Sequence, residues 1–134
     1  MKIVLDTNVF LVSISSKSKL HWVFTSLLRG DYILYLTNEI LSEYLEIIER
    51  HMGHEASQSA GGVLENLSNV RFINTYYRFE ILKDTDDNKF VDCAIASNAD
   101  FIVTHDKDFN LLREISFPKI SVIDTADFKI KLKK

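Results

Sequence analysis

Cysteine and proline are each represented once in this 134-residue chain. With Cys93 alone, an intrachain disulfide and a paired-cysteine metal clip are both excluded, and a reducing compartment is favoured. No apolar run approaches the roughly 18 residues of a membrane span. Lys2 leads directly into a strand-like segment without the pattern of a signal peptide. We therefore expect a cytoplasmic protein that makes no use of a membrane.

Excess positive charge is absent as well, because 16 Lys and Arg stand against 19 Asp and Glu and give a net charge of −3. Such a chain does not attract polyanions through its overall field, so a nucleic-acid partner would need help from metal ions. The content of 46% hydrophobic and 26% charged residues is ordinary for a globular protein. The length suits a single domain, residues 1–134, with its own core.

Short apolar runs alternate with amphipathic helical patterns along the chain. Clusters of β-forming residues predict strands over residues 2–6, 32–36, 69–73, 101–104 and 119–123. Apolar residues at helical spacing predict helices over residues 9–14, 20–28, 37–48, 88–98 and 108–113. Three glycines predict a broken helical piece over residues 52–66. This alternation predicts an α/β fold, a three-layer α/β/α sandwich with a central, mostly parallel sheet of about five strands.

Four acids fall where such a sheet places its functional side chains. Asp6 ends the first predicted strand, Glu43 lies in the helix after the second strand, and Asp92 and Asp106 flank the fourth strand. Because sites form outside the carboxyl ends of parallel strands, we expect these acids to reach one edge of the sheet. Asp92 is the hardest of these acids to explain structurally, because its neighbours in FVDCAIA are apolar and an unpaired buried carboxylate is destabilising.

Carboxylates without a matching cluster of histidines or cysteines are the ligand set of a hard cation, Mg²⁺ or Mn²⁺ rather than Zn²⁺. Such an ion lowers the pKa of a bound water and offsets charge on the attacking and leaving oxygens of a phosphodiester. Thr7, Asn8 and Thr104 are placed to orient ligands or waters. The pattern therefore predicts a metal-dependent site for phosphoryl chemistry.

Three blocks of sequence also resemble a known family: LDTNVF at 5–10, EILSEYLEI at 39–47 and DDNKFVDCAIASNADFIVTHDKDF at 86–109. In this order they resemble the PIN-domain family, especially its VapC-like toxins of toxin-antitoxin pairs. The resemblance implies a metal-dependent endoribonuclease that cuts single-stranded or loop RNA, often as a homodimer and often inhibited by a cognate antitoxin. By position, the resemblance implies that the catalytic metal ligands are Asp6, Glu43, Asp92 and Asp106. It implies that Asn8, Thr104 and Asp108 are supporting residues.

Several residues have a second interpretation at this stage. Asp86 and Asp87 are favoured as cap and turn residues over metal ligands. Tyr76 and Tyr77 either stack on bases or pack over the sheet edge, and packing is favoured. His105 stands where many relatives have a small or amide residue, so it either contacts RNA or simply ends the strand.

Three other functions compete with the toxin ribonuclease. One is an RNA-processing or quality-control nuclease without an antitoxin, and another is a non-catalytic RNA-binding scaffold. An aspartyl phosphatase with Asp6 as nucleophile is disfavoured, because Asn8 stands where such an enzyme would have its second acid.

Overall fold

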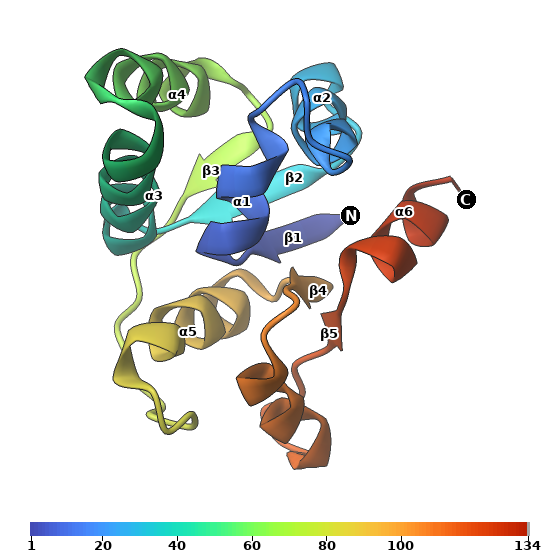
Figure 1. The fold of residues 1–134 in the computed structure, drawn as a ribbon. Helices are drawn as coiled ribbons and strands as arrows, with labels where there is room; N and C mark the ends of the chain where they lie inside the picture. The colour runs from blue at the N-terminus through green and yellow to red at the C-terminus, as the bar shows by residue number, and fades with distance from the viewer. Residues whose placement is uncertain (134) are drawn as a thin grey trace.

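The computed structural model describes residues 1–133 and is built on one five-stranded sheet with the strand order β3-β2-β1-β4-β5 (Figure 1). Each strand pairs in parallel with its neighbours. The predicted α/β fold with a central parallel sheet is therefore confirmed. The strands are β1 (Lys2–Leu5), β2 (Ile33–Leu36), β3 (Val70–Phe72), β4 (Phe101–Val103) and β5 (Val122–Ile123).

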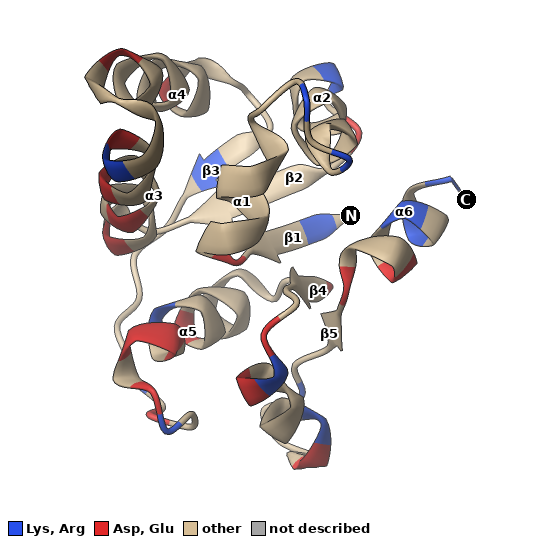
Figure 2. Cartoon of the chain, viewed as in Figure 1, with Lys and Arg blue, Asp and Glu red and all other residues tan. Residues whose placement is uncertain are grey.

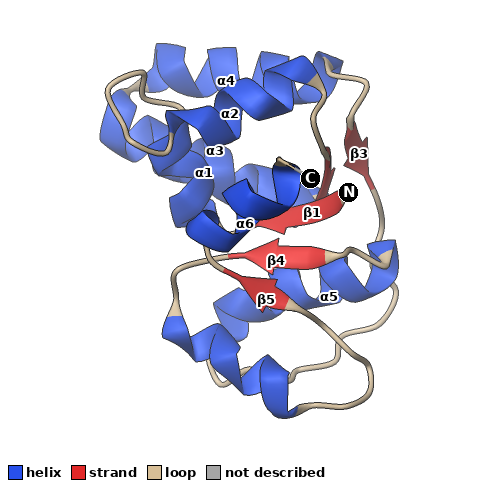
Figure 3. Ribbon diagram, turned by 90° about the vertical axis from the view of Figure 1, so that its right-hand side faces the viewer, coloured by secondary structure: helices blue, strands red, loops and turns tan. Residues whose placement is uncertain are grey.

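Helices cover both faces of this sheet. In β1, Ile3, Val4 and Leu5 are all fully buried, although successive side chains of a strand point to opposite faces. Helix α5 (Asn88–Ser97) packs against β1, β2 and β4 from one side. The other side is covered by helices near the two ends of the chain (Figure 3), namely α1 (Thr7–Ser13), α2 (His21–Arg29) and α6 (Thr125–Leu132).

Helix α6 is an element that the sequence patterns did not indicate. Its N-cap is Asp124, whose side chain accepts a hydrogen bond of 2.8 Å from the Asp127 backbone N–H. Its buried residue Phe128 packs edge-on against Tyr32 and lies 5.6 Å, centroid to centroid, from Trp22 of α2. Phe128 is thus the buried aromatic anchor of α6, and the partly buried Leu132 also packs against the core. Within residues 1–133 no helix combines the length and apolar character that crossing a membrane requires.

Helices α3 (Asn38–Met52) and α4 (His54–Asn66) pack side by side and are joined at Gly53, whose φ of 96° favours glycine. The cap of α3 is Thr37, whose hydroxyl accepts a hydrogen bond from the Ile40 backbone N–H. In contrast, α4 is continuous where its glycines predicted a break. Gly61 lies against Leu45 of α3, so glycine here suits close packing between helices.

Two short 3₁₀ segments flank the fourth strand, η1 (Thr85–Asp87) before α5 and η2 (Lys107–Glu114) after β4. The helix predicted over residues 108–113 is therefore a 3₁₀ helix that begins at Lys107, and its cap is Asp106. The Asp106 side chain accepts a hydrogen bond of 2.9 Å from the Asp108 backbone N–H. This cap fixes both acids at the carboxyl end of β4.

Candidate metal centre

Asp6 and Thr104 begin the site, because they follow the neighbouring strands β1 and β4 directly. Thr104 donates its hydroxyl hydrogen to Asp6 Oδ2 at 2.7 Å, and the same hydroxyl oxygen accepts from the Asp106 backbone N–H at 3.0 Å. Both partners of this hydroxyl are acids predicted as ligands. The predicted supporting position of Thr104 thus corresponds to a direct contact with Asp6.

The Asp6 carboxyl is buried and lies among other acids. Burial raises its pKa above the ordinary value, against the hydrogen bonds from the Thr104 hydroxyl and the Thr7 backbone, which lower it. The nearby carboxylates of Asp106 and Glu43 raise it further. Asp6 is therefore a buried acid whose ionised form is disfavoured by its acidic neighbours.

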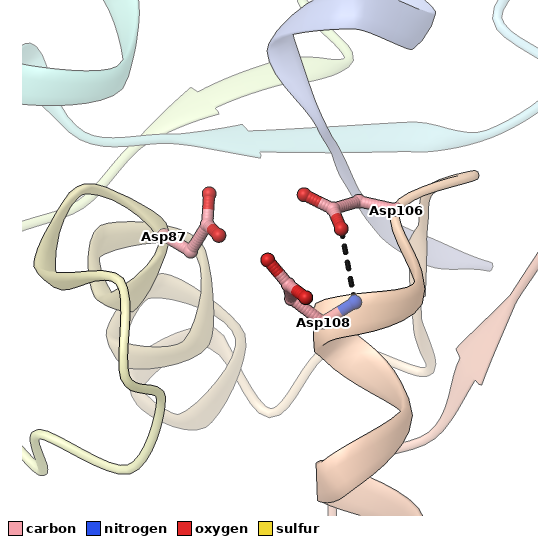
Figure 4. A group of neighbouring side chains, drawn as sticks. All are labelled: Asp87, Asp106 and Asp108. Atoms are coloured by element: carbon pink, nitrogen blue, oxygen red, sulfur yellow. Dashed lines mark hydrogen bonds between the residues drawn. The ribbon is translucent and has the colours of Figure 1, made fainter.

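A group of carboxylates lies where α5 begins and η2 begins, two places that Figure 2 colours as acidic. Asp87, Asp106 and Asp108 each offer one oxygen, and these three oxygens lie within 4.8 Å of one another. Figure 4 shows Asp87 facing Asp106 and Asp108 from the start of α5. Asp87 is half-buried, and its Oδ2 is inaccessible to water and has no hydrogen-bond partner within residues 1–133.

The chemistry of this group fits a hard cation. A buried carboxylate oxygen without a donor is destabilising unless a proton or a cation reaches it. Burial, followed by the charges of Asp84, Asp106, Asp6 and Asp108, raises the pKa of Asp87 to about 6. All candidate donors are carboxylate oxygens, which suit Mg²⁺ and Mn²⁺ better than Zn²⁺. The residues present therefore fit a divalent cation held among Asp87, Asp106 and Asp108, with Asp6 as a further acid near them.

Glu43 lies next to this group but already has a cationic partner. Its Oε2 accepts a hydrogen bond from the Thr7 hydroxyl, and its Oε1 lies 2.8 Å from Lys89 Nζ. The Lys89 side chain is only 8% exposed, so the ion pair is largely shielded from water. Glu43 thereby connects α1 to α5, and a cation bound directly to it would compete with Lys89.

Asp92 does not join these acids, contrary to the predicted convergence of Asp92 with Asp6 and Asp106. Its Oδ1 accepts a hydrogen bond of 3.1 Å from the Phe79 backbone N–H. Burial raises the pKa of Asp92, the Phe79 N–H and Arg78 lower it, and Glu39 and Glu80 raise it. It lines a separate cavity of about 90 Å³ together with Glu39, Arg78 and Lys89.

Helix geometry explains why Asp87 and not Asp92 faces Asp106. Five residues separate them, which places Asp92 roughly 140° around the helix and about 7.5 Å further along its axis. Helix α5 leads into β4, so its first residue is the one at the carboxyl edge of the sheet. Asp87 occupies the predicted N-cap position of α5 but makes no side-chain capping hydrogen bond. In the sequence, its position directly before a predicted helix at this edge of the sheet was the feature that could have identified Asp87 as a site residue.

The remaining predicted residues surround the acids. Asn8 lines a cavity of about 320 Å³ together with Asp6, His105 and Asp106. His105 Nε2 lies 2.9 Å from the Thr125 hydroxyl, which connects the end of β4 to α6. Asp108, predicted only as a supporting residue, is a member of the carboxylate group itself. Lys83 and Lys107 line an adjoining cavity of about 590 Å³ with Asp108.

Comparison with known proteins identifies a family model and a relative that match this chain. A family model described as PIN domain matches residues 2–108. The uncharacterized protein MJ1680 of Methanocaldococcus jannaschii is 31% identical over 121 residues, which cover 85% of this chain and 76% of that protein.

Two solved structures share the fold at low sequence identity. VapBC2 from Rickettsia felis, solved bound to a DNA fragment from its promoter, has a TM-score of 0.64 at 20% identity and covers 92% of this chain and 98% of its own. VapC20 from Mycobacterium tuberculosis, described as a Sarcin-Ricin loop cleaving toxin, has a TM-score of 0.60 at 15% identity and covers 81% and 92%. At these identities the likeness establishes the fold.

Proposed function

The chain belongs to the PIN domain family, and from this premise we propose that it is an endoribonuclease that hydrolyses single-stranded or loop RNA with bound Mg²⁺ or Mn²⁺. One observation carries the proposal. The carboxylates of Asp87, Asp106 and Asp108 converge within 4.8 Å, and the buried Asp87 Oδ2 among them has no donor within the described residues. A divalent cation would stabilise such a group, and membership of the PIN domain family supports a nuclease.

Asp6, Asp87, Asp106 and Asp108 would hold the cation, and Glu43 would supply negative charge beside them. A bound divalent cation would lower the pKa of a coordinated water and offset charge on the phosphodiester oxygens. The Thr104 hydroxyl holds the Asp6 carboxylate and the Asp106 backbone in fixed positions. Asp92 is left out of this set, because its carboxylate is used by the backbone of Phe79.

Lys83 and Lys107 supply positive charge on the substrate side of the acids. They line the 590 Å³ cavity together with Asp84, Asp108, Asn110, Leu111 and Glu114, so both lysines lie beside carboxylates. Lysine side chains contact phosphates without reading sequence, and such contacts position a nucleic-acid strand. We infer that this cavity receives phosphates next to the one that is cleaved.

The toxin role is a further part of the proposal. The fold shared with VapBC2 and VapC20 supports it, and VapC20 is described as a Sarcin-Ricin loop cleaving toxin. In this role an antitoxin protein would cover the acidic group, and the chain would act as a homodimer. Co-purification with the product of an adjacent small reading frame tests the role. A chain with no such partner that still cleaves RNA would instead be an RNA-processing nuclease.

The proposal is tested by cleavage of a fluorogenic single-stranded RNA in Mg²⁺ or Mn²⁺, with EDTA as the metal-free arm. We expect EDTA and Asp87→Asn to abolish cleavage. Asp92→Asn is expected to retain it, because an amide oxygen can still accept the hydrogen bond from Phe79. Asp86→Asn is the matched control, since Asp86 is an exposed neighbour outside the carboxylate group.

The outcomes separate the two candidate acids of this segment. Loss of cleavage in Asp92→Asn with full activity in Asp87→Asn would restore Asp92 as the ligand and refute the set proposed above. Full activity in EDTA would refute the metal-dependent mechanism altogether.

A further inference from the structure

The segment of residues 74–80, which we name the tyrosine segment, connects β3 to the residues before α5 and is exposed along its whole length. Tyr76 is 84% exposed and Tyr77 is 76% exposed. Sequence analysis favoured packing of these rings over the sheet edge, and the structure contradicts that interpretation. Two adjacent tyrosines therefore present their rings to solvent, although each could bury about 150 Å² or more against a partner.

The tyrosine segment is anchored at both ends. The Ile73 backbone N–H donates to the Leu36 carbonyl at 2.9 Å, which continues the pairing of β3 with β2. At the other end the Phe79 N–H donates to Asp92 Oδ1 at 3.1 Å. Asn88 then holds buried Leu82 through both its N–H, at 2.8 Å, and its carbonyl, at 3.1 Å.

These hydrogen bonds give Asp92 a structural role, which differs from its predicted role as a metal ligand. Asn88 and Asp92 are four residues apart and so lie on the same face of α5, where both hold the chain that follows the tyrosines. A buried acid inside an apolar helix is here explained by a backbone contact. Because the segment is held in place, docking a ligand on Tyr76 and Tyr77 costs less ordering entropy than docking on a free loop.

The tyrosine segment leaves the carboxyl end of β3 at the edge of the sheet that carries the acids. In the sheet order β3 lies two strands from β1, a distance of roughly 10 Å at the usual strand spacing. Thr75 and Arg78 of the segment line a small cavity with Lys89. Lys89 in turn pairs with Glu43, which accepts from Thr7 directly after Asp6. The cavity beside the tyrosine segment thus adjoins the Lys89–Glu43 ion pair, which leads to the start of α1 after Asp6.

We propose that Tyr76 and Tyr77 form a stacking platform for unpaired bases of the RNA strand that is cleaved at the acidic group. The proposal rests on the proposed function, since it takes RNA as the substrate. Stacking on tyrosine accepts any base but requires a base free of its helix, so the platform selects single-stranded over duplex RNA. Arg78 next to the tyrosines adds a cation within reach of the same strand.

The test is binding of a fluorescent single-stranded RNA to the full chain in the Asp87→Asn background, where cleavage is expected to be absent. We expect the double variant Y76A/Y77A to weaken binding by about tenfold or more, and Y76F/Y77F to restore it, because phenylalanine keeps the stacking face. The matched control is Phe117→Ala, which removes an 89% exposed aromatic ring from the loop that enters the amino end of β5. That control is expected to bind as tightly as the parent chain.

A second measurement reports contact directly. RNA that carries 4-thiouridine is photocrosslinked to the chain, and the crosslinked peptide is identified by mass spectrometry. We expect the crosslink on the tyrosine segment and its loss in Y76A/Y77A. Unchanged affinity of Y76A/Y77A, or equal loss in Y76F/Y77F and Phe117→Ala, would overturn the platform and leave the exposed rings for a protein partner. These binding results do not depend on whether the parent chain cleaves RNA, so the two proposals fail separately.

Discussion

Asp87→Asn is expected to stabilise the metal-free protein at neutral pH while it removes nuclease activity. Burial and neighbouring carboxylates raise the pKa of Asp87 from its ordinary value of 3.8 to about 6. Between these two values the unfolded chain releases a proton that the folded chain keeps, so stability falls as pH rises through this window. Above about pH 6 the whole penalty of the charged carboxylate is present.

The size of the effect follows from the same difference in pKa. A difference of about two corresponds to roughly 3 kcal/mol. Although Asp87 Oδ2 is buried, the residue as a whole is only half-buried, so screening reduces the penalty to about 1 to 2 kcal/mol. For a chain of this length that corresponds to a rise of about 4 to 7 °C in the Tm of the variant at pH 8. At pH 4 most of the penalty is absent, so the two proteins should melt at nearly the same temperature.

The assay is thermal unfolding of both proteins at pH 4 and pH 8, with EDTA and with saturating Mg²⁺. Bound cation stabilises the native state in proportion to the logarithm of its concentration over Kd. Mg²⁺ should therefore raise the Tm of the parent chain and leave that of Asp87→Asn nearly unchanged. A metal-free variant that melts below its parent at pH 8, together with an equal response to Mg²⁺, would refute the reasoning.

Three further predictions concern the surroundings of the acids. Thr104→Val should lower Mg²⁺ affinity by about 10- to 100-fold in calorimetric titration, because it removes the hydroxyl that holds Asp6 and the Asp106 backbone. Thr104→Ser keeps a hydroxyl and should restore the affinity. An unchanged affinity in Thr104→Val would contradict the role of the hydroxyl. Glu43→Gln should lower the free energy of unfolding in urea by about 2 to 3 kcal/mol, because it leaves the shielded Lys89 without its carboxylate. A variant as stable as the parent chain would mean that Lys89 reaches water instead. K83A/K107A should reduce the slope of log affinity for single-stranded RNA against log salt by about 1.4, and a slope equal to that of the parent chain would remove both lysines from the substrate path.

The strands and the sheet could be predicted because their signal is local. In β1 three consecutive apolar residues are buried on both faces, which is the pattern expected of a central parallel strand. Helix α6 could not be predicted in this way. Its attachment depends on a long-range contact of Phe128 with Trp22 and Tyr32, which no local periodicity reveals.

The candidate site was predictable to the level of the sheet edge but not of every side chain. Asp6, Thr104 and Asp106 follow strand ends directly, so topology alone brings them together. The choice between Asp87 and Asp92 depends on the angle between two positions of one helix. Apolar neighbours identified Asp92 as unusual, yet the backbone N–H that satisfies it comes from Phe79, thirteen residues earlier in the chain.

The position of a bound metal ion tests the central claim most directly. Crystals grown with Mn²⁺ can be measured at the manganese absorption edge, so that the anomalous signal locates the ion without regard to activity. The account predicts an anomalous peak within coordination distance of Asp87 and Asp106, on the side of Asp6. A peak in the cavity of Asp92 and Glu39, with none beside Asp87 and Asp106, would contradict it.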